Sequence, residues 1–534
     1  MSIENSKGKD HKPLSPPPNG PKPSADQPSL GRAANKSNTA PGQQNLVNLS
    51  YNYSVDPEPA QSEEQVRVEQ FPVSVPDRPV LILDKAWEPA PTPQAESRAK
   101  QVEKARSLLD RDRWLIKNGH TITYIGLYLF SILVLFRPYE IVPGLGFLVA
   151  TAFYFAMLTL AIYVPSQVIV ESNLTLMTTE VKAILALTLI ALVTMPIAKD
   201  PEVAWKQFND PYIKAVIIFI VLINVVRTRK RLMGLMWLSL GIAVYLGTEA
   251  LAMYINGQFR VEKYRVAVEV GGMFGNPNEM ALHFVMMTPL AITLGLASKG
   301  IRRWIFLAMG VLFVGANMVT FSRGGFVGLV ACAAVLAWKL GRKYRLNVTV
   351  ASILVLILSV LASPENYGKR VMSILFRGMD AAGSSDQRKE LLQRSLLVTA
   401  RNPWGIGIGN FPIVGVHNLG THNAFTQVSS ELGILGLVVY LIFMISPFRK
   451  LRAIERLQFD ADKLDWFYYM SIGLQASVIG YMVTSFFASV AYNWFIYYLI
   501  AYAVAFRRIY SVETGRTPQP QPLWEWEWPK TQTA

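Results

Sequence analysis

Long apolar runs dominate the chain, and each is long enough to cross a lipid bilayer. A membrane-spanning helix needs about 20 mostly apolar residues, because the hydrocarbon core is about 30 Å thick and each helical residue rises about 1.5 Å. On that template we count about twelve runs. The expected spans are 119–136, 143–163, 177–197, 212–226, 232–255, 279–298, 302–320, 324–340, 347–363, 422–446, 466–486 and 489–507. The predicted fold class is therefore all-α, a polytopic transmembrane helical bundle.

The loops between these runs differ in charge. Basic clusters recur in every second loop, at positions 227–231, 299–303, 339–345, 449–456 and 507–508. Because cytoplasmic loops are enriched in lysine and arginine, the alternation predicts that both termini are cytoplasmic. The same bias explains the formal net charge of +15, so we expect no nucleic-acid partner.

Composition divides the chain into segments. Residues 1–100 are rich in Pro, Ser, Asn, Gln and Gly, so we expect a disordered cytoplasmic tail. Residues 101–118 are basic and are expected along the inner membrane surface, 119–510 form the transmembrane domain, and 511–534 form a cytoplasmic tail. The first apolar run begins too late for a secretory signal peptide. The chain has 1 cysteine, Cys332, which lies within an apolar run, so no intramolecular disulfide or cysteine-based metal site can form.

The longest loop of the domain, 364–421, is predicted on the outer side. Leucines at helical spacing between 386 and 400 indicate an amphipathic helix on the outer surface. The loop also carries basic residues, namely Arg388, Lys389, Arg394 and Arg401. A lipid diphosphate fits such a surface; anionic lipid headgroups are the alternative.

Two predicted spans begin at the outer face with unusual polar residues. Helix N-termini carry unpaired N–H groups and a partial positive charge. In the first of these spans, Asn276 fits the N-cap, Pro277 fits the first helical position, and Glu279 lies two residues further on. In the second, Arg323 and the helix N-terminus together form a natural anion site. The two glycines after Arg323 let another backbone or a ligand approach closely. The alternative for Arg323 is an interfacial anchor that snorkels to the headgroups.

A third span begins with His422 and Asn423. A helix N-terminus disfavours the imidazolium, so a neutral His422 could accept a proton as a general base. Glu431 lies further along the same predicted helix and is either functional or a buried partner of an outer-face arginine. The outer loops contain no Asp-x-Asp pair and no His/Asp cluster with metal spacing. We therefore expect no metal, with arginines supplying the counter-charge for a diphosphate.

In their order along the chain, these motifs resemble the O-antigen ligase/polymerase family of bacterial membrane glycosyltransferases. The likeness covers roughly residues 121–510. The first three stretches that carry it are Phe136-Arg137-Pro138, Gly275-Asn276-Pro277-Asn278 and Phe321-Ser322-Arg323-Gly324-Gly325. The long loop adds Arg388 and Asn402-Pro403-Trp404-Gly405-Ile406-Gly407-Ile408-Gly409-Asn410-Phe411. The last stretches are His422-Asn423-Ala424-Phe425 and Glu431-Leu432-Gly433-Ile434-Leu435-Gly436-Leu437.

The resemblance implies a GT-C-like architecture in the bacterial inner membrane, with a periplasmic active site. It implies transfer of a glycan from undecaprenyl diphosphate to an acceptor hydroxyl of lipid A-core or a related glycan, lipid or protein, without a metal or cofactor. His422, Arg323 and Arg265 fall on the family's catalytic positions. The residues expected to bind the diphosphate or the substrate are Arg388, Asn278, Asn423 and Glu431.

The mechanism expected from this resemblance is a direct displacement that inverts the anomeric centre. His422 deprotonates or orients the acceptor hydroxyl, while Arg265 and Arg323 hold the departing diphosphate. A polysaccharide polymerase and a protein O-oligosaccharyltransferase share the motifs and remain alternatives. A membrane transporter is the alternative from another class, but its polar groups would gather near the bilayer midplane, often within inverted repeats.

Overall fold

The computed structural model describes most of the predicted transmembrane domain. The described residues are 120–142, 144–146, 148–261, 264–270, 274–342, 365–372 and 384–516, with isolated positions between 346 and 357. The predicted tail 1–100, the basic segment 101–118, most of the predicted span 347–363 and the end of the chain from 517 lie outside the described residues.

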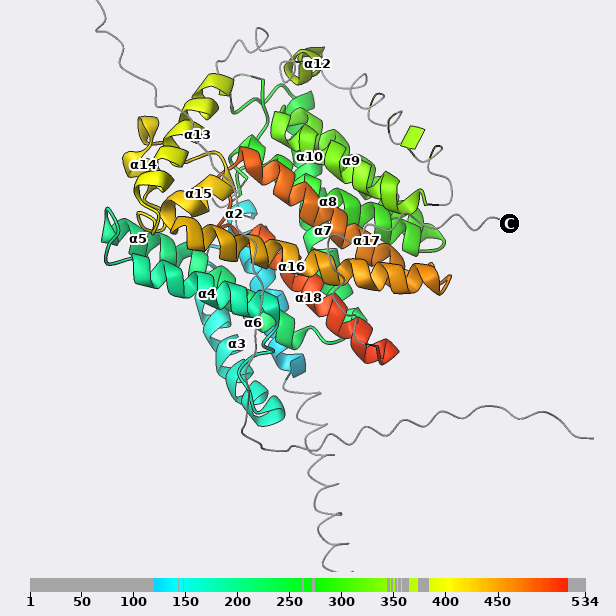
Figure 1. Cartoon of the computed structure of the whole chain (residues 1–534). Coiled ribbons are helices and arrows are strands. Elements are labelled where there is room, and N and C mark those ends of the chain that lie inside the picture. Colours follow the sequence, from blue (N-terminus) through cyan, green and yellow to red (C-terminus); the bar gives the residue numbers. More distant parts are fainter. Residues whose placement is uncertain are drawn as a thin grey trace, which may run out of the picture. The chain divides into compact units, whose positions relative to one another are not determined.

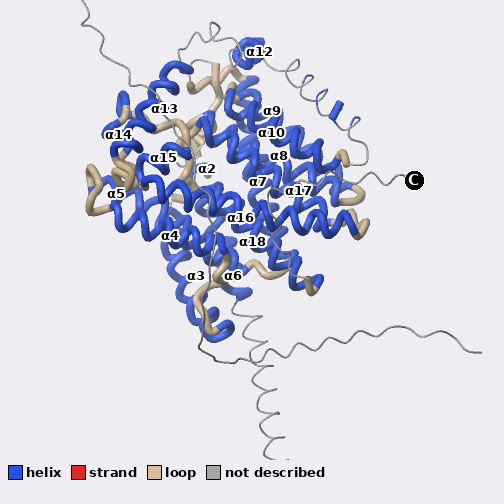
Figure 2. The backbone as a smooth tube through the Cα atoms, viewed as in Figure 1, coloured by secondary structure: helices blue, strands red, loops and turns tan. Residues whose placement is uncertain are grey.

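Helices form all the regular structure in the described part of the chain (Figure 2), where one isolated β-bridge joins Val261 and Arg265. Among the described residues, 8 helices are long and apolar enough to cross a membrane. These are Pro201–Val225, Arg229–Ile255, Pro277–Ala297, Ile301–Val319, Arg323–Leu340, Gly433–Asp460, Trp466–Phe487 and Trp494–Thr514. Two shorter apolar helices, His120–Phe136 and Tyr154–Ile169, precede them. The all-α polytopic fold is confirmed, whereas the total of about twelve spans stays a prediction.

The elements follow the labels of Figure 1. After the helix His120–Phe136, whose last turn is η1 (Ile132–Phe136), come α2 (Pro138–Ile141), α3 (Leu148–Glu171), α4 (Thr179–Thr194), α5 (Pro201–Gln207), η2 (Phe208–Tyr212), α6 (Ile213–Val225), α7 (Arg229–Ile255), α8 (Pro277–Ala297), α9 (Ile301–Val319) and α10 (Arg323–Leu340). They are followed by α12 (Glu365–Met372), α13 (Ser384–Arg401), α14 (Phe411–Val414), η4 (Val416–Asn418), α15 (Ala424–Glu431), α16 (Gly433–Asp460), α17 (Trp466–Thr484), η5 (Ser485–Phe487) and α18 (Trp494–Thr514).

The segment predicted as one span over 422–446 is divided into two helices. Helix α15 ends at Glu431, and α16 begins at Gly433, which has a positive φ of 76°. A Cβ at Gly433 would lie 2.4 Å from the Pro403 carbonyl oxygen, so only glycine fits this corner. Glu431 does lie in the helix that follows His422, as predicted, but that helix ends there and is not itself the span. Glu431 is the last residue of a short helix that precedes the span.

Helices α8, α17 and α18 form the centre of the bundle, because nearly all their side chains are buried. Small residues let these helices approach closely. A Cβ on Gly473 of α17 would lie 2.1 Å from the Thr293 hydroxyl of α8. Such contacts are typical of membrane bundles, where van der Waals packing holds helices together.

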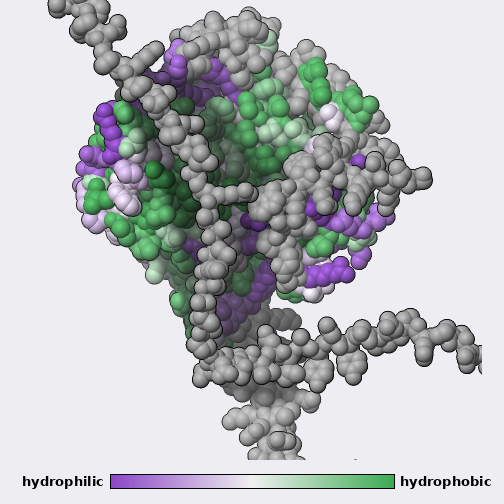
Figure 3. All heavy atoms as spheres, viewed as in Figure 1, coloured by the Kyte–Doolittle hydropathy of each residue, from purple (hydrophilic) through white to green (hydrophobic). Residues whose placement is uncertain are grey.

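The outer surface of the helices is strongly apolar, as the green areas in Figure 3 show. Large exposed apolar side chains include Leu189 of α4 and Val311 of α9. Exposed tryptophans mark the ends of the helical body, with Trp304 and Trp338 at one end and Trp205 and Trp404 at the other. Tryptophan prefers the membrane–water interface, so this distribution fits a bilayer surrounding the bundle.

Buried ion pairs bring the basic ends of the helices together on one side, here called the basic face. Glu180 of α4 is fully buried and accepts two hydrogen bonds from Arg507 of α18, at 2.6 and 2.9 Å. Glu455 of α16 binds Lys339 and Arg342 at the end of α10. Three of the basic clusters in the sequence, 339–345, 449–456 and 507–508, therefore contribute to ion pairs on this side.

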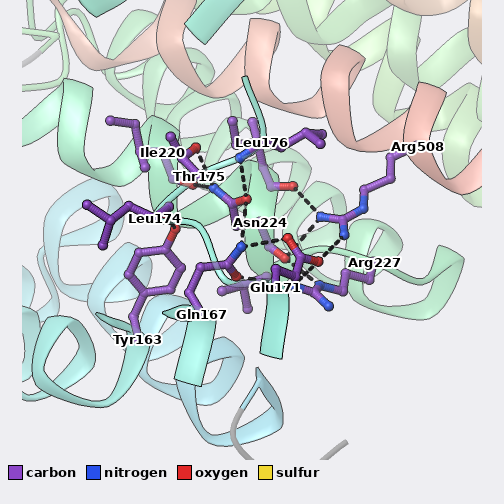
Figure 4. Close-up of polar contacts among 12 residues, drawn as sticks. Tyr163, Gln167, Glu171, Leu174, Thr175, Leu176, Ile220, Asn224, Arg227 and Arg508 are labelled. Carbon is purple, nitrogen blue, oxygen red and sulfur yellow. Dashed lines mark hydrogen bonds and ion pairs between the residues drawn. The ribbon is translucent and has the colours of Figure 1, made fainter. Parts of the chain in front are cut away.

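A third carboxylate at the basic face joins α3 to α6 and α18 (Figure 4). Glu171 lies 2.8 Å from the guanidinium nitrogens of both Arg227 and Arg508. Asn224 of α6 lies behind this cluster, and its amide donates to Thr175 while its Oδ1 accepts from the Leu176 N–H. These contacts hold the α3–α4 connection against α6. The opposite ends of the helices form the other side of the bundle, which we call the site face.

Candidate functional site

A cleft of about 320 Å³ lies at the site face, and three of its lining side chains are basic. It is lined by Arg323, Val327, Arg388, Lys389, Leu392, Thr421, His422, Asn423, Phe486 and Phe487. We call it the cationic cleft, because this lining contains no carboxylate. The structure therefore brings Arg323 and Arg388 together with the adjacent pair His422 and Asn423, from three separate parts of the sequence.

Arg323 is presented by a capped helix start that packs tightly on its neighbours. Ser322 is the N-cap of α10, and its hydroxyl accepts a hydrogen bond from the Gly325 N–H. A Cβ on Gly324 would lie 2.8 Å from Phe487, and one on Gly325 would lie 2.7 Å from Ala281. The two glycines therefore permit close approach of η5 and α8, and Phe487 consequently reaches the cleft.

His422 lies just before α15, in the left-handed region of backbone conformation, with a φ of 51°. The backbone N–H of His422 donates to the Ser489 hydroxyl at 2.8 Å. The Asn423 side chain caps α15 by accepting from the backbone N–H groups of Phe425 and Thr426. Burial, and then the nearby Arg388 guanidinium, lower the pKa of the His422 imidazole. The cleft therefore holds a neutral histidine beside several cations.

Arg265 and Asn278 lie outside the lining of the cationic cleft. Arg265 is only 4% exposed, and its guanidinium donates to the Thr320 carbonyl and to Asn278 Oδ1, each at 2.9 Å. The Ser322 hydroxyl donates to the same Asn278 oxygen. This network ties the start of α8 to the start of α10, so Arg265 supports the segment that carries Arg323.

Glu431 holds a glycine-rich loop in place. Its two carboxylate oxygens accept from the backbone N–H groups of Gly409 and Phe411, at 2.9 and 3.2 Å. Burial raises the pKa of the Glu431 carboxyl to about 7, although these two N–H groups oppose the shift. Within the described part of the chain, no arginine pairs with Glu431. The alternative in which Glu431 is a buried partner of an arginine is therefore not met among these residues, whereas a contact between Glu431 and substrate stays a prediction.

The same loop anchors the start of α5, and its backbone conformation requires glycine at two positions. The Lys199 N–H donates to Ile406, and the Asp200 N–H donates to the Asn410 side chain at 2.6 Å. Gly407 and Gly409 have φ values of 97° and 74°, which L side chains rarely adopt. The loop therefore joins α15, which follows His422, to the segment that starts at α5.

A second and larger hollow of about 710 Å³ lies beside the cleft, and we call it the lateral groove. Its apolar wall comes from the helix His120–Phe136, α3 and α6, with Leu127, Leu160 and Ile217 among its members. Its polar lining comprises Arg137, Tyr139, Thr159, Asn209, Asp210, Lys214, Glu279, Ser489 and Asn493. Because Ser489 lines the groove and accepts from His422, the two hollows share a wall.

Sequence reasoning missed the lateral groove and the role of Ser489. One signal was available, because Arg137 belongs to a recognised motif and yet follows an apolar span. The structure places Arg137 at a positive-φ corner between η1 and α2, in the groove lining. Among the described residues, no group of 3 or more His, Cys, Asp or Glu is placed to hold a metal ion.

Comparisons with known proteins give a family match and one related protein. Residues 308–441 match the family model described as O-Antigen ligase. A protein described as an O-antigen polymerase from Salmonella muenchen is 26% identical over 209 residues, which are 37% of this chain and 51% of the relative. The chain thus spans about half the length of this curated relative. The segment matched by the family model includes Arg323, Arg388 and His422 of the cationic cleft.

Proposed function

Because this chain belongs to the O-antigen ligase/polymerase family of multi-pass bacterial membrane proteins, we propose that it moves a glycan from undecaprenyl diphosphate to an acceptor hydroxyl. The observation that carries the proposal is the cationic cleft, where Arg323, Arg388 and Lys389 surround a neutral His422. A diphosphate needs such a concentration of positive charge, particularly where no metal takes part.

The donor diphosphate binds in the cationic cleft. Guanidinium groups contact phosphate oxygens through two parallel hydrogen bonds, and they stabilise the charge that grows as the glycosidic bond breaks. Phe486 and Phe487 line the same cleft, and Phe486 is half exposed, so an apolar surface for the prenyl chain adjoins the cations. Arg265 acts indirectly, through Asn278 and Ser322, by holding the backbone that presents Arg323.

The acceptor binds in the lateral groove. Its charged lining residues are Arg137, Lys214, Asp210 and Glu279, which sum to zero net charge. Such a lining suits the hydroxyl groups of a glycan, while the apolar wall suits the hydrocarbon of a lipid anchor. The acceptor oxygen attacks the anomeric carbon and the diphosphate departs, which inverts that centre. His422 orients the reactants or takes the acceptor proton.

The proposed location is the inner membrane, with both termini in the cytoplasm and the cationic cleft at the periplasmic face. Support comes from the ion pairs that gather the basic helix ends on the face opposite the cleft. Short loops rich in lysine and arginine stay in the cytoplasm.

Deletion of the gene, followed by gel analysis of surface glycans, tests this proposal. The strain is complemented with the wild type, with Arg323→Ala, and with Arg401→Ala, which alters an exposed arginine of α13 outside the cleft. Loss of long glycan from its final acceptor, with full-length lipid-linked polymer accumulating, indicates a ligase. Single repeat units left without long chains indicate a polymerase.

Arg401→Ala is expected to restore the wild-type pattern, and Arg323→Ala to fail. Unchanged lipid-linked and surface glycans in the deletion strain would exclude the ligase and polymerase readings. Glycans missing only from proteins would point to protein O-glycosylation, and altered solute flux alone would favour a transporter.

A further inference from the structure

One carboxylate in the lateral groove has no partner that explains it. Glu279 lies in the first turn of α8 and lines the groove with Ser489 and Asn493. Resting on the proposed function, we infer that Glu279 binds the acceptor hydroxyl and takes its proton during transfer.

Helix capping does not account for Glu279. A glutamate at this position can bond back to the N-cap backbone. Here the cap is Asn276, whose side chain accepts from the Asn278 N–H, while the Glu279 carboxylate faces Asn493 Nδ2 at 3.5 Å. Within the described ranges, no lysine or arginine lies within 4.0 Å of this carboxylate. A partly buried carboxylate in a membrane protein is costly to keep, so its place in a substrate-sized groove calls for a functional explanation.

The other ionisable groups in or near the groove are less suited to accept the acceptor proton. Asp210 is paired with Lys214 at 2.8 Å, and its side chain is 64% exposed. Arg137 is the remaining charged residue of the lining. His283, one turn after Glu279, is buried against Phe274 and Phe495 and is not part of the lining. Glu279 is therefore the acceptor-side group best suited to accept a proton.

The position of Glu279 also suits the direction of attack. The donor diphosphate leaves toward the cationic cleft, so an in-line nucleophile arrives from the other side of the anomeric carbon. Ser489 connects the two sides, since it lines the groove with Glu279 and accepts from the His422 N–H at 2.8 Å. His422 then orients the donor on the cleft side, and Glu279 serves the acceptor on the groove side.

The step balances without a further reactant. A bond forms between the acceptor oxygen and the anomeric carbon, while the bond from that carbon to the phosphate oxygen breaks. The bonding electron pair leaves with the diphosphate. The hydroxyl proton moves to a Glu279 oxygen and passes to water when the product departs.

The test compares Glu279→Gln with wild type in purified protein reconstituted in lipid nanodiscs. Donor and acceptor are isolated from the deletion strain, and initial rates are measured against donor concentration and pH. Gln keeps the size and hydrogen bonding of the side chain but is not a base. The expected result is a fall in kcat of about 10²–10⁴-fold, with the donor KM within about threefold of wild type. The pH profile of kcat should also lose one titrating group on its acid side.

The matched control is Glu269→Gln, which makes the same chemical change in the loop before α8. Glu269 is exposed and forms a surface ion pair with Arg260, so wild-type rates are expected. Glu279→Asp should keep part of the rate, because it retains a carboxylate at a greater distance. If Glu279→Gln fails to fold, Glu279→Asp decides instead: a kcat below wild type with the acid-side titrating group retained is expected, and a wild-type kcat would overturn the inference.

A Glu279→Gln enzyme with wild-type kcat and an unchanged pH profile would overturn the inference while leaving the proposed function intact. If the wild-type enzyme itself consumes no lipid-diphosphate donor, the proposed function fails instead.

Discussion

Arg323 and His422 reach the cationic cleft from two differently built helix starts. Arg323 follows an N-cap serine and precedes glycines that neighbouring elements press against, whereas His422 sits at a left-handed corner fixed by Ser489. In both cases backbone contacts of adjacent residues place the side chain. The chemistry of the cleft therefore depends on uncharged neighbours as well as on its cations.

The first residue-scale prediction concerns Arg323. Arg323→Lys keeps the charge but loses the planar pair of donors, so we expect a fall in kcat of about tenfold. Arg323→Ala should cost about 10²–10³-fold, the usual effect of removing one donor to a developing anion. Steady-state rates with the lipid-linked donor provide the measurement. Equal rates for Arg and Lys at this position would show that charge alone matters.

The second residue-scale prediction concerns Arg388 and pH. Burial and Arg388 both lower the pKa of His422, so its neutral form persists to lower pH than in a free histidine. Activity that needs neutral His422 is present above that pKa and is lost as the pH falls through it. Arg388→Gln removes one cause of the lowering, so the acid-side loss of kcat should begin at a higher pH. A pH–rate profile measures this shift, and movement toward lower pH would contradict it.

At the scale of elements, buried ion pairs and backbone contacts join helices that the chain separates widely. Glu180 and Arg507 join α4 to α18, and the glycine-rich loop joins α15 to α5 through Glu431 and Asn410. Helix α15 is short and does not itself qualify as a span. Its position, and with it that of His422, is held at the two ends by Ser489 and by the loop.

One prediction belongs to these element contacts. Glu180→Ala leaves Arg507 buried without its carboxylate and should lower the free energy of unfolding by about 3–5 kcal/mol. The double replacement Glu180→Leu with Arg507→Met substitutes apolar side chains and should recover much of this loss. Thermal unfolding in detergent compares the variants. If the double variant were no more stable than Glu180→Ala, the pair would have a role beyond mutual neutralisation.

At the scale of the whole described domain, two hollows of different character meet at one wall. The cationic cleft carries the basic lining, and the lateral groove carries a charge-balanced lining with a long apolar wall. In the proposed function, the cleft holds the donor and the groove holds the acceptor. On that proposal, donor binding and acceptor binding can be altered independently.

The prediction at this scale uses a residue remote from the cleft. Leu160→Trp narrows the apolar wall of the lateral groove, so the KM for the acceptor should rise by about tenfold, which corresponds to roughly 1.4 kcal/mol. The donor KM should stay close to wild type. Leu189→Trp, on the exposed face of α4, is the matched control. A rise in donor KM, with acceptor KM unchanged, would show that the groove holds the donor.

The local pattern of residues was enough to predict the elements. Apolar length gave most spans within a few residues, and the caps at Asn276 and Ser322 were readable because capping depends on adjacent residues. Two observed elements differ from the predicted spans. At the break between α15 and α16, the Pro403 carbonyl packs against Gly433. The segment predicted as 212–226 is preceded by α5, from which a kink at Asp210 separates it.

The sequence by itself determined the fold class, because the length and polarity of a run decide whether a helix is stable in lipid. It also picked out Arg323 and His422, because arginine and histidine at polar helix starts are conspicuous in an apolar chain, and Arg388, which lies among the basic residues of the long loop. Only the tertiary structure separated these residues from Arg265, Asn278 and Glu431, whose polar groups are taken up by other parts of the chain. Only the tertiary structure, too, placed Glu279 and Ser489 in the lateral groove. The physical reason is that a side chain's partners come from segments tens to hundreds of residues away, and no local pattern records which helix ends will meet.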